Sequence, residues 1–301
     1  MTYEQLLQEI AINDQQYVVM TAENRALVRN LPKVLGDRFI DTGITEQTMM
    51  GAAAGLALRG RKPIVHALAA FLTMRAFEFT RTSIGIPHFP VKMSSFIPGF
   101  LSDGNGPTHQ AVEDIAIMRG IPGMEVFAPA DEDDLVKMLP AIWETENPSY
   151  VRINTTANQY KHSIFELGKA EIISEGKDAT ILTYGFMFEN SYQAMLSLRE
   201  AGFDVGLVNV RSLHPFDVEM LKALVGKTQL IVAIEDHFLT GGLFSIVAEQ
   251  LVTNHWSVPV KAIALDARWF RPGRLLDVIE FEGFDVANLV TRISTLIQEN
   301  Q

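Results

Sequence analysis

The strongest constraint on the fold is the regular alternation of short apolar segments with helix-like segments along the whole chain. Strands that alternate with helices form parallel sheets whose faces are covered by those helices. The segments are apolar throughout rather than at every second residue, which is typical of strands buried on both faces. The sequence therefore predicts an α/β fold with mostly parallel sheets. The expected strands are residues 17–20, 63–68, 91–93, 124–127, 149–153, 179–184, 204–210, 230–234 and 258–264.

The alternation is interrupted between residues 154 and 178. This part begins with the polar run NTTANQYKHS and continues as AEIISEGKD, which has the pattern of a hairpin. A chain of 301 residues is long enough for about two domains of ordinary size. We therefore expect two consecutive α/β domains, residues 1–160 and residues 161–301.

Composition excludes several classes of function. The chain has no cysteine, which rules out disulfides, thiolate catalysis and cysteine-ligated zinc. Its formal net charge is −11, and no run of Lys and Arg offers a surface for nucleic acid. The opening TYEQLLQEI has no pattern of a secretory signal, and no apolar run approaches the roughly 20 residues of a membrane span. We expect a cytoplasmic protein that acts on small molecules, with no nucleic-acid or membrane partner.

Several familiar site motifs are incomplete or missing. Residues 225–228, VGKT, match the end of a phosphate-binding loop, but Leu221 stands where its first glycine is needed. No GxGxxG follows a strand, and HExxH does not occur. His109 and Glu113 have helical spacing but no third ligand, so we expect no metal ligands in this chain.

Three segments contain the residues on which a function can be argued. In residues 41–57, DTGITEQTMMGAAAGLA, a strand ends and a helix begins with Glu46 in its first turn, where the helix N-terminus stabilises an acid. The second segment is FLTMRAFE at residues 71–78, and the third is GNGPTHQAVED at residues 104–114. Taken singly, they are explained equally well by a solvated helix start, a packed aromatic and a loop histidine.

In this order and spacing the three segments resemble the transketolase family, specifically its carboxy-terminal half. That half consists of a pyrimidine-binding domain followed by a smaller terminal domain. The resemblance continues through RSLHPFD at residues 211–217 and EDHFLTGG at residues 235–242, so it covers nearly the whole chain. It implies a transferase that uses thiamine diphosphate and Mg²⁺ to move a two-carbon ketol unit from a ketose to an aldehyde or another acceptor.

The resemblance also implies roles for particular residues. Glu46 matches the acid that contacts N1′ of the cofactor's aminopyrimidine, Phe71 matches the aromatic that stacks on that ring, and Ile44 belongs to the same cofactor site. His109 matches the active-site histidine, a residue type that can bind substrate oxygens and move a proton near neutral pH. We expect Glu46 and His109 to be catalytic. For Arg75 and the helix that follows it, we expect packing or contacts between subunits.

The family holds the diphosphate and Mg²⁺ on a separate amino-terminal domain, through Gly-Asp-Gly and a later Asn. This chain contains no Gly-Asp-Gly. The resemblance therefore implies a split enzyme in which a partner subunit with the Gly-Asp-Gly…Asn motif holds most of the cofactor and the Mg²⁺. We expect the active site at the interface of the two subunits and an α2β2 assembly.

The substrate side departs from the family pattern in three places. The loop of sugar-phosphate transketolases usually has an acid where this chain has Gly104, followed by Asn105 in place of Asp, and SFI at residues 95–97 replaces a histidine pair. Thr155 stands where an arginine often binds the acceptor's phosphate, and the loss of such a donor is not conservative. We expect a substrate other than, or additional to, the standard pentose phosphates. Weaker candidates for substrate or anion contacts are Asp103, Asn105, Gln110, Arg25 and Arg29.

Two other functions remain open on the sequence alone. The β-subunit of a ketoacid dehydrogenase, or of an enzyme that acylates a carrier protein, shares the two-domain plan and the activating glutamate. The GPTHQ segment favours the transketolase branch. A non-catalytic regulatory relative would have no reason to keep Glu46 in a cofactor cleft.

Overall fold

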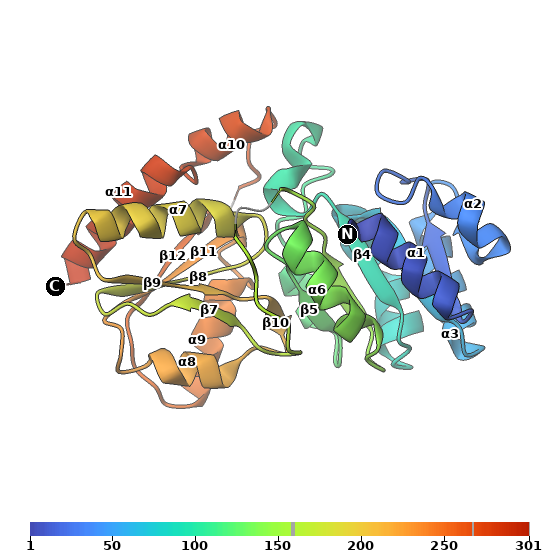
Figure 1. Ribbon diagram of the computed structural model, residues 1–301, viewed down its shortest axis with the longest axis horizontal. Helices are drawn as coiled ribbons and strands as arrows, with labels where there is room; N and C mark the ends of the chain where they lie inside the picture. The colour runs from blue at the N-terminus through green and yellow to red at the C-terminus, as the bar shows by residue number, and fades with distance from the viewer. Residues whose placement is uncertain (158–159, 267, 301) are drawn as a thin grey trace.

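The computed structural model of the chain describes residues 1–157, 160–266 and 268–300. It contains two mostly parallel sheets, each flanked by helices (Figure 1). The strands are β1 (Tyr17–Thr21), β2 (Phe39–Asp41), β3 (Lys62–Leu68), β4 (Lys92–Phe96), β5 (Glu125–Phe127), β6 (Ser149–Arg152), β7 (Glu171–Ser174), β8 (Ala179–Thr183), β9 (Val205–Asn209), β10 (Ser212–His214), β11 (Ile231–Phe238) and β12 (Val260–Leu265).

The helices alternate with these strands, as the sequence predicts. The α-helices are α1 (Tyr3–Asn13), α2 (Leu31–Leu35), α3 (Glu46–Leu58), α4 (Phe77–Phe79), α5 (Asp114–Arg119), α6 (Glu132–Trp143), α7 (Met187–Glu200), α8 (Val218–Leu224), α9 (Leu243–Thr253), α10 (Leu275–Glu282) and α11 (Val286–Asn300). Short turns of other helical types are η1 (Gly36–Arg38), η2 (Phe71–Arg75), η3 (Thr80–Gly85) and η4 (Gly99–Asn105). Among the described residues, no helix combines the length and the apolar character that a membrane crossing requires.

The first sheet has the order β10-β5-β6-β4-β3-β1-β2, and all its pairs are parallel except β10 with β5. Successive residues of β1 face opposite sides, as the period of a strand requires. Val18 and Met20 pack in one core cluster with residues of α3, whereas Tyr17 and Val19 pack in another with residues of α1 and α6. Burial on both faces explains why hydrophobicity in this strand is continuous rather than alternating.

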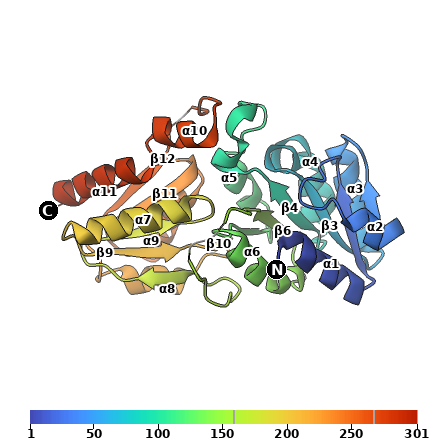
Figure 2. The same cartoon turned by 45° about the horizontal axis from the view of Figure 1, so that its top comes forward.

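The second sheet has the order β12-β11-β8-β9-β7, with only β7 antiparallel to its neighbour. Helices α7 and α11 cover one face, and α8 and α9 lie on the other (Figures 1 and 2). The chain therefore has the α/β class and the two mostly parallel sheets that the sequence predicts. The carboxy-terminal helix α11 ends at the far side of this second sheet from the first.

Two strands pair differently from what the sequence suggests. The AEIISEGKD segment is not a hairpin, because β7 pairs with β9 rather than with the next strand, β8. Strand β10 comes from the second half of the chain yet extends the first sheet, with Ser212 opposite Phe127 of β5. Both are pairings between distant segments, which local sequence patterns do not specify.

Buried charges join the two halves. Arg152, the last residue of β6, contacts Asp236 of β11 with 2.7 Å between Nη1 and Oδ1, and Asp114 of α5 with 3.0 Å between Nε and Oδ2. All three side chains are almost completely buried. Charges removed from water in this way are stable only when each is paired. The network therefore fixes the start of α5, and with it the preceding loop, against the second sheet.

Candidate active site

A cavity of about 670 Å³ lies beyond the carboxyl ends of β1, β2 and β3. In parallel α/β sheets, ligands bind at this edge because the loops that follow adjacent strands converge there. The lining comes from the segments after each of the three strands and from the loop before α5. The residues that line it are Ala22, Glu23, Asn24, Arg25, Ala26, Arg29, Ile44, Glu46, Leu68, Phe71, Arg75 and His109.

The structure brings together four of the residues that the sequence assigns to the site, namely Ile44, Glu46, Phe71 and His109. Glu46 is the first residue of α3 and is only 2% exposed, so its carboxylate lies at the positive end of the helix dipole. Ile44, two residues earlier in the loop, is 67% exposed at the mouth of the cavity. A buried acid at a helix N-terminus, in a cavity that an apolar side chain also lines, can bind a flat, hydrogen-bonding ring.

Phe71 begins the wide turn η2, in which the backbone amide of Ala76 donates to the Phe71 carbonyl at 3.0 Å. Such π-type turns are frequent at functional sites. The ring of His109 meets the edge of Phe71, with 5.0 Å between the ring centroids. Two residues that are far apart in the sequence thus form one aromatic wall of the cavity.

Arg75 is the residue whose place in the site the sequence does not predict. Its Nη1 lies 3.2 and 3.1 Å from the two carboxylate oxygens of Glu46, and its Cζ lies 3.6 Å from the centroid of the Phe71 ring. Beside the packing or subunit contact expected of Arg75, the structure shows an ion pair with Glu46 inside the cavity. Physical reasoning could have identified this pair, because a buried, ionised acid needs a cation nearby. Arg75 is close in sequence to Phe71, whose ring is expected beside Glu46.

The weaker substrate candidates Asp103, Asn105 and Gln110 are not among the described residues that line the cavity. Asn105 donates from Nδ2 to the Ser102 carbonyl at 3.1 Å, and Asp103 accepts a hydrogen bond from the next backbone amide. Gln110 is 1% exposed and donates from Nε2 to the carbonyl of Phe270 at 2.8 Å. These side chains stabilise the loop and its contact with the second half of the chain, and in this structure the loop directs none of them into the cavity.

Arg25 and Arg29 both line the cavity, as the alternative of a new anion contact requires. Arg25 forms an ion pair with Asp41 at the end of β2. Arg29 is exposed and, within the described part of the chain, forms no ion pair. Among the described residues, Arg29 is therefore the cavity arginine without an ion-pair partner.

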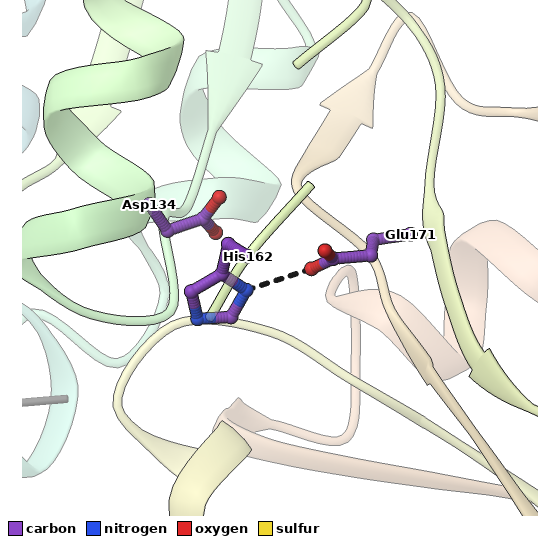
Figure 3. A group of neighbouring side chains, drawn as sticks. All are labelled: Asp134, His162 and Glu171. Carbon is purple, nitrogen blue, oxygen red and sulfur yellow. Dashed lines mark hydrogen bonds and ion pairs between the residues drawn. The ribbon is translucent and has the colours of Figure 1, made fainter. Parts of the chain in front are cut away.

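A second cluster of charged side chains lies between the two sheets, where Asp134 of α6, His162 and Glu171 of β7 converge (Figure 3). His162 Nδ1 lies 2.7 Å from Glu171 Oε2, and its Nε2 lies 2.9 Å from Asp131 Oδ2. Burial alone would lower the pKa of His162, but the hydrogen bonds to Asp131 and Glu171 raise it to about 9. A protonated imidazole is not a metal ligand.

Arg211 supplies the second cation of this cluster. Its Nε lies 3.0 Å from Asp134 Oδ1 and its Nη2 lies 2.6 Å from Glu171 Oε2. Burial opposes ionisation of Glu171, yet its contacts with His162 and Arg211 bring its pKa down to about 2. The carboxylates of Asp131, Asp134 and Glu171 thus each pair with His162 or Arg211, and the cluster is an ion-pair network rather than a metal centre.

Comparison with known proteins agrees with this geometry. Residues 1–159 match the family described as transketolase, pyrimidine binding domain, and residues 168–289 match transketolase, C-terminal domain. The chain belongs to the transketolase family. A 6-deoxy-6-sulfo-D-fructose transketolase subunit of Clostridium sp. (strain MSTE9) is 35% identical over 269 residues, which are 88% of this chain and 83% of that protein.

Two further relatives are similar in length to this chain. A subunit of the apulose-4-phosphate transketolase of Phocaeicola vulgatus is 32% identical over 94% of this chain and 92% of its own. A solved structure titled as a split gene transketolase, inactive beta4 tetramer, superposes with a TM-score of 0.88 at 31% identity, over 99% of this chain and 97% of that chain. The similarity therefore extends over both halves of the chain.

Transketolases depend on thiamine diphosphate, and the cavity of this transketolase-family chain suits one part of that cofactor. An aminopyrimidine is flat, aromatic and rich in hydrogen-bonding nitrogen atoms. Phe71 offers a ring face, and Glu46 offers a buried acceptor at a helix N-terminus. The chemistry of these two side chains fits the pyrimidine end of the cofactor.

Proposed function

We propose that this chain is the smaller subunit of a two-chain, thiamine-diphosphate-dependent transketolase and supplies the pyrimidine-binding half of a shared active site. The observation that supports this most directly is the convergence of Glu46, Phe71 and His109 in one cavity. Its relatives of similar length include proteins named as transketolase subunits. The absence of Gly-Asp-Gly from the sequence is the reason for proposing a second chain.

Each site residue has a defined task in this proposal. When bound, thiamine diphosphate supplies the electron-accepting centre that allows the C2–C3 bond of a ketose to break. Glu46 would bind the aminopyrimidine and exchange a proton at its N1′ atom. Phe71 would hold one face of the ring, and Ile44 would exclude water at the rim. His109, at the edge of Phe71, would bind the oxygens of the substrate.

The diphosphate and Mg²⁺ are assigned to the partner. Mg²⁺ prefers carboxylate, carbonyl and water oxygens, whereas the described ionisable residues that line this cavity beyond Glu46 are Glu23 and three arginines, together with His109. We propose that a subunit with a Gly-Asp-Gly…Asn motif binds the metal and the diphosphate, and that two such pairs form an α2β2 assembly. The solved relative titled as an inactive beta4 tetramer is consistent with a small subunit that needs a partner.

We assign recognition of the substrate's anionic group to Arg29. Its guanidinium is exposed at the cavity and has no carboxylate partner among the described residues. A phosphate or sulfonate would form charge-assisted hydrogen bonds with it. In this proposal, Arg29 takes the place of the acceptor-binding arginine that is common at the position of Thr155.

The proposal also includes the domain division at residues 160 and 161. The strands of the first sheet, apart from β10, all end by Arg152, and those of the second begin at Glu171 or later. Residues 158 and 159, which immediately precede the division, lie outside the described residues.

Calorimetric titration of thiamine diphosphate with Mg²⁺ tests the proposed function. We expect tight binding to the mixture of this chain with its diphosphate-binding partner and weak binding to this chain alone. Glu46→Gln should weaken binding in the mixture by at least about tenfold, because a neutral amide replaces a charged acceptor. Glu219→Gln, a change of an exposed acid on α8, is the matched control and should have no effect.

Other results would contradict specific parts of the proposal. Tight binding to this chain alone would exclude a shared site. Binding that is unaffected by Glu46→Gln would remove Glu46 from the cofactor site. A complex that binds the cofactor but acylates a carrier protein instead of forming a ketose would identify the ketoacid dehydrogenase branch. An associated complex without any cofactor binding would favour a regulatory subunit.

A further inference from the structure

The guanidinium of Arg75 lies between the two groups that the proposed function assigns to the aminopyrimidine. It contacts both carboxylate oxygens of Glu46 at 3.1 and 3.2 Å, and it lies 3.6 Å above the ring of Phe71. This distance is typical of two flat groups stacked in direct contact. A second flat group therefore does not fit on this face of Phe71 while Arg75 is there.

We propose that Arg75 is a placeholder for the aminopyrimidine: it occupies the ring's position in the cofactor-free subunit and swings out when the cofactor enters. This inference rests on the proposed function and adds a residue to it that competes with the cofactor. Arg75 is accordingly a residue that controls access to the site, not one that binds the ring.

The chemical match between the two groups supports the inference. A guanidinium is planar and delocalised, stacks on aromatic faces and donates two hydrogen bonds to one carboxylate. An aminopyrimidine is also planar, stacks on the same face and hydrogen-bonds to the same acid. Each of the two contacts that Arg75 makes is thus a contact that the ring would make.

Burial explains why a placeholder is needed. The side chain of Glu46 is only 3% exposed, and an ionised carboxylate at such a depth requires a partner. Arg75 provides that partner until the cofactor replaces it. Of the arginines that line the cavity within the described residues, Arg25 is paired with Asp41 and Arg29 does not contact Glu46.

The exposure of Arg75 shows how it can leave. Its side chain is 41% exposed, in contrast to the buried Glu46, so part of the side chain is already in contact with solvent. The released guanidinium would enter water, where its charge is fully hydrated. Rotation of the side chain is sufficient, and η2 can keep its hydrogen bonds.

Competition of this kind predicts the sign of a mutational effect. The measured affinity of a ligand falls in proportion to the fraction of protein that is competent to bind it. Removal of the guanidinium should therefore tighten cofactor binding and accelerate it. A residue that contacts the bound cofactor would have the opposite effect when removed.

The first experiment uses this chain alone. Arg75→Ala leaves space for a free guanidinium ion beside Glu46, so guanidinium chloride at a concentration well below denaturing should raise the Tm of this variant relative to NaCl at equal ionic strength. Wild type and Arg81→Ala, a change of an exposed arginine in η3 whose ion pair is with the exposed Glu78, should show no such rise. An equal response in all three proteins would overturn the proposal.

The second experiment measures cofactor binding in the complex with the diphosphate-binding partner. Arg75→Met retains the apolar stem, and we expect its Kd for thiamine diphosphate to fall by about tenfold, with a faster association rate in stopped flow. Arg274→Met, a change of an exposed arginine just before α10 that is paired with Asp277, should match wild type. A higher Kd for Arg75→Met would show that Arg75 binds the cofactor, and would overturn the placeholder role.

Two further controls separate the possible failures. If Arg75→Met is unstable because Glu46 is left unpaired, the double variant Arg75→Met, Glu46→Gln should recover the Tm of wild type, and failure to recover it would disprove the coupling of the two residues. If the wild-type complex binds no cofactor, the proposed function fails. The guanidinium experiment then still decides whether Arg75 pairs with Glu46 in the free chain.

Discussion

Gly99, at the start of η4, is a single residue on which the contact between the two halves depends. Its φ is +55°, a value that glycine adopts freely, and its amide donates to the carbonyl of Ala111 at 2.9 Å. A Cβ at this position would lie 1.8 Å from Oδ2 of Asp236 and 2.8 Å from Nη2 of Arg152. The absence of a side chain thus allows the buried ion pair to lie against the backbone.

We therefore predict that Gly99→Ala is strongly destabilising. The new methyl group must displace a buried carboxylate, and the backbone conformation is itself unfavourable for alanine, so the loss should exceed about 3 kcal/mol. Urea unfolding at neutral pH measures it. Gly60→Ala is the control, because φ is +75° there but nothing lies within 4 Å. Its cost should be about 1 kcal/mol, and equal losses at the two sites would contradict the role of close packing.

At the scale of elements, the segment between β1 and α2 forms the outer wall of the cavity. Thr21, at the end of β1, donates from Oγ1 to the carbonyl of Asn24 at 2.6 Å, and Arg25 is tied to Asp41. At the far end, Glu4 of α1 accepts from the amide of Asn30 at 2.6 Å. The segment is held at both ends, which leaves Arg29 in a fixed stretch of backbone, with no carboxylate partner for its guanidinium among the described residues.

This arrangement predicts the effect of Arg29→Gln on substrates. If Arg29 binds the anionic group, KM for a phosphorylated donor such as fructose 6-phosphate should rise by about tenfold with little change in kcat, because one charge-assisted contact is lost. The KM for unphosphorylated fructose should not change. Steady-state kinetics of the complex measure both, with Arg59→Gln at the end of α3 as the control. An unchanged KM for the phosphorylated donor would rule out this role.

For the whole molecule, the charged cluster around His162 couples the two sheets. It includes Asp134 of α6 and Glu171 of β7 (Figure 3). Arg211, just before β10, contacts both of these acids. The side chain of His162 is fully buried and its pKa is about 9, above the 6.5 of a free histidine. Between these two pH values only the folded protein keeps the proton.

The sign of the resulting pH dependence follows from this shift. The contribution of His162 to stability is fully present below pH 6.5 and is lost as pH rises through about 9. The free energy of unfolding should therefore fall over this window, by up to about 1.4 kcal/mol per pH unit from this one group. Urea unfolding between pH 6.5 and 9.5 measures the slope.

Substitution identifies the group responsible for that slope. His162→Asn should remove the contribution of one proton to the slope, which is up to about 1.4 kcal/mol per pH unit. It should also lower the free energy of unfolding at pH 6.5 by about 3–5 kcal/mol, because it leaves buried carboxylates without a partner. His255→Asn, at an exposed histidine with a φ of +57°, should leave the slope as in wild type. A wild-type slope in His162→Asn would assign the pH dependence to other residues.

The sequence alone was sufficient for the class of fold and for most of the strands. Most of the central strands are buried on both faces, so apolar residues predominate along them, and this pattern is visible within a few residues of sequence. The pairings of β7 with β9 and of β10 with β5 were not predictable in the same way. They join segments whose proximity depends on the folding of everything between them.

The same division applies to the candidate site. The resemblance to the transketolase family singled out Ile44, Glu46, Phe71 and His109, which the fold brings to one cavity. Only the tertiary structure revealed that Arg75 pairs with Glu46 and that the side chain of Gln110 is used to anchor its loop. A sequence determines which side chains are available, whereas their partners depend on distances between segments that meet only after folding, where each buried charge must find its counter-charge.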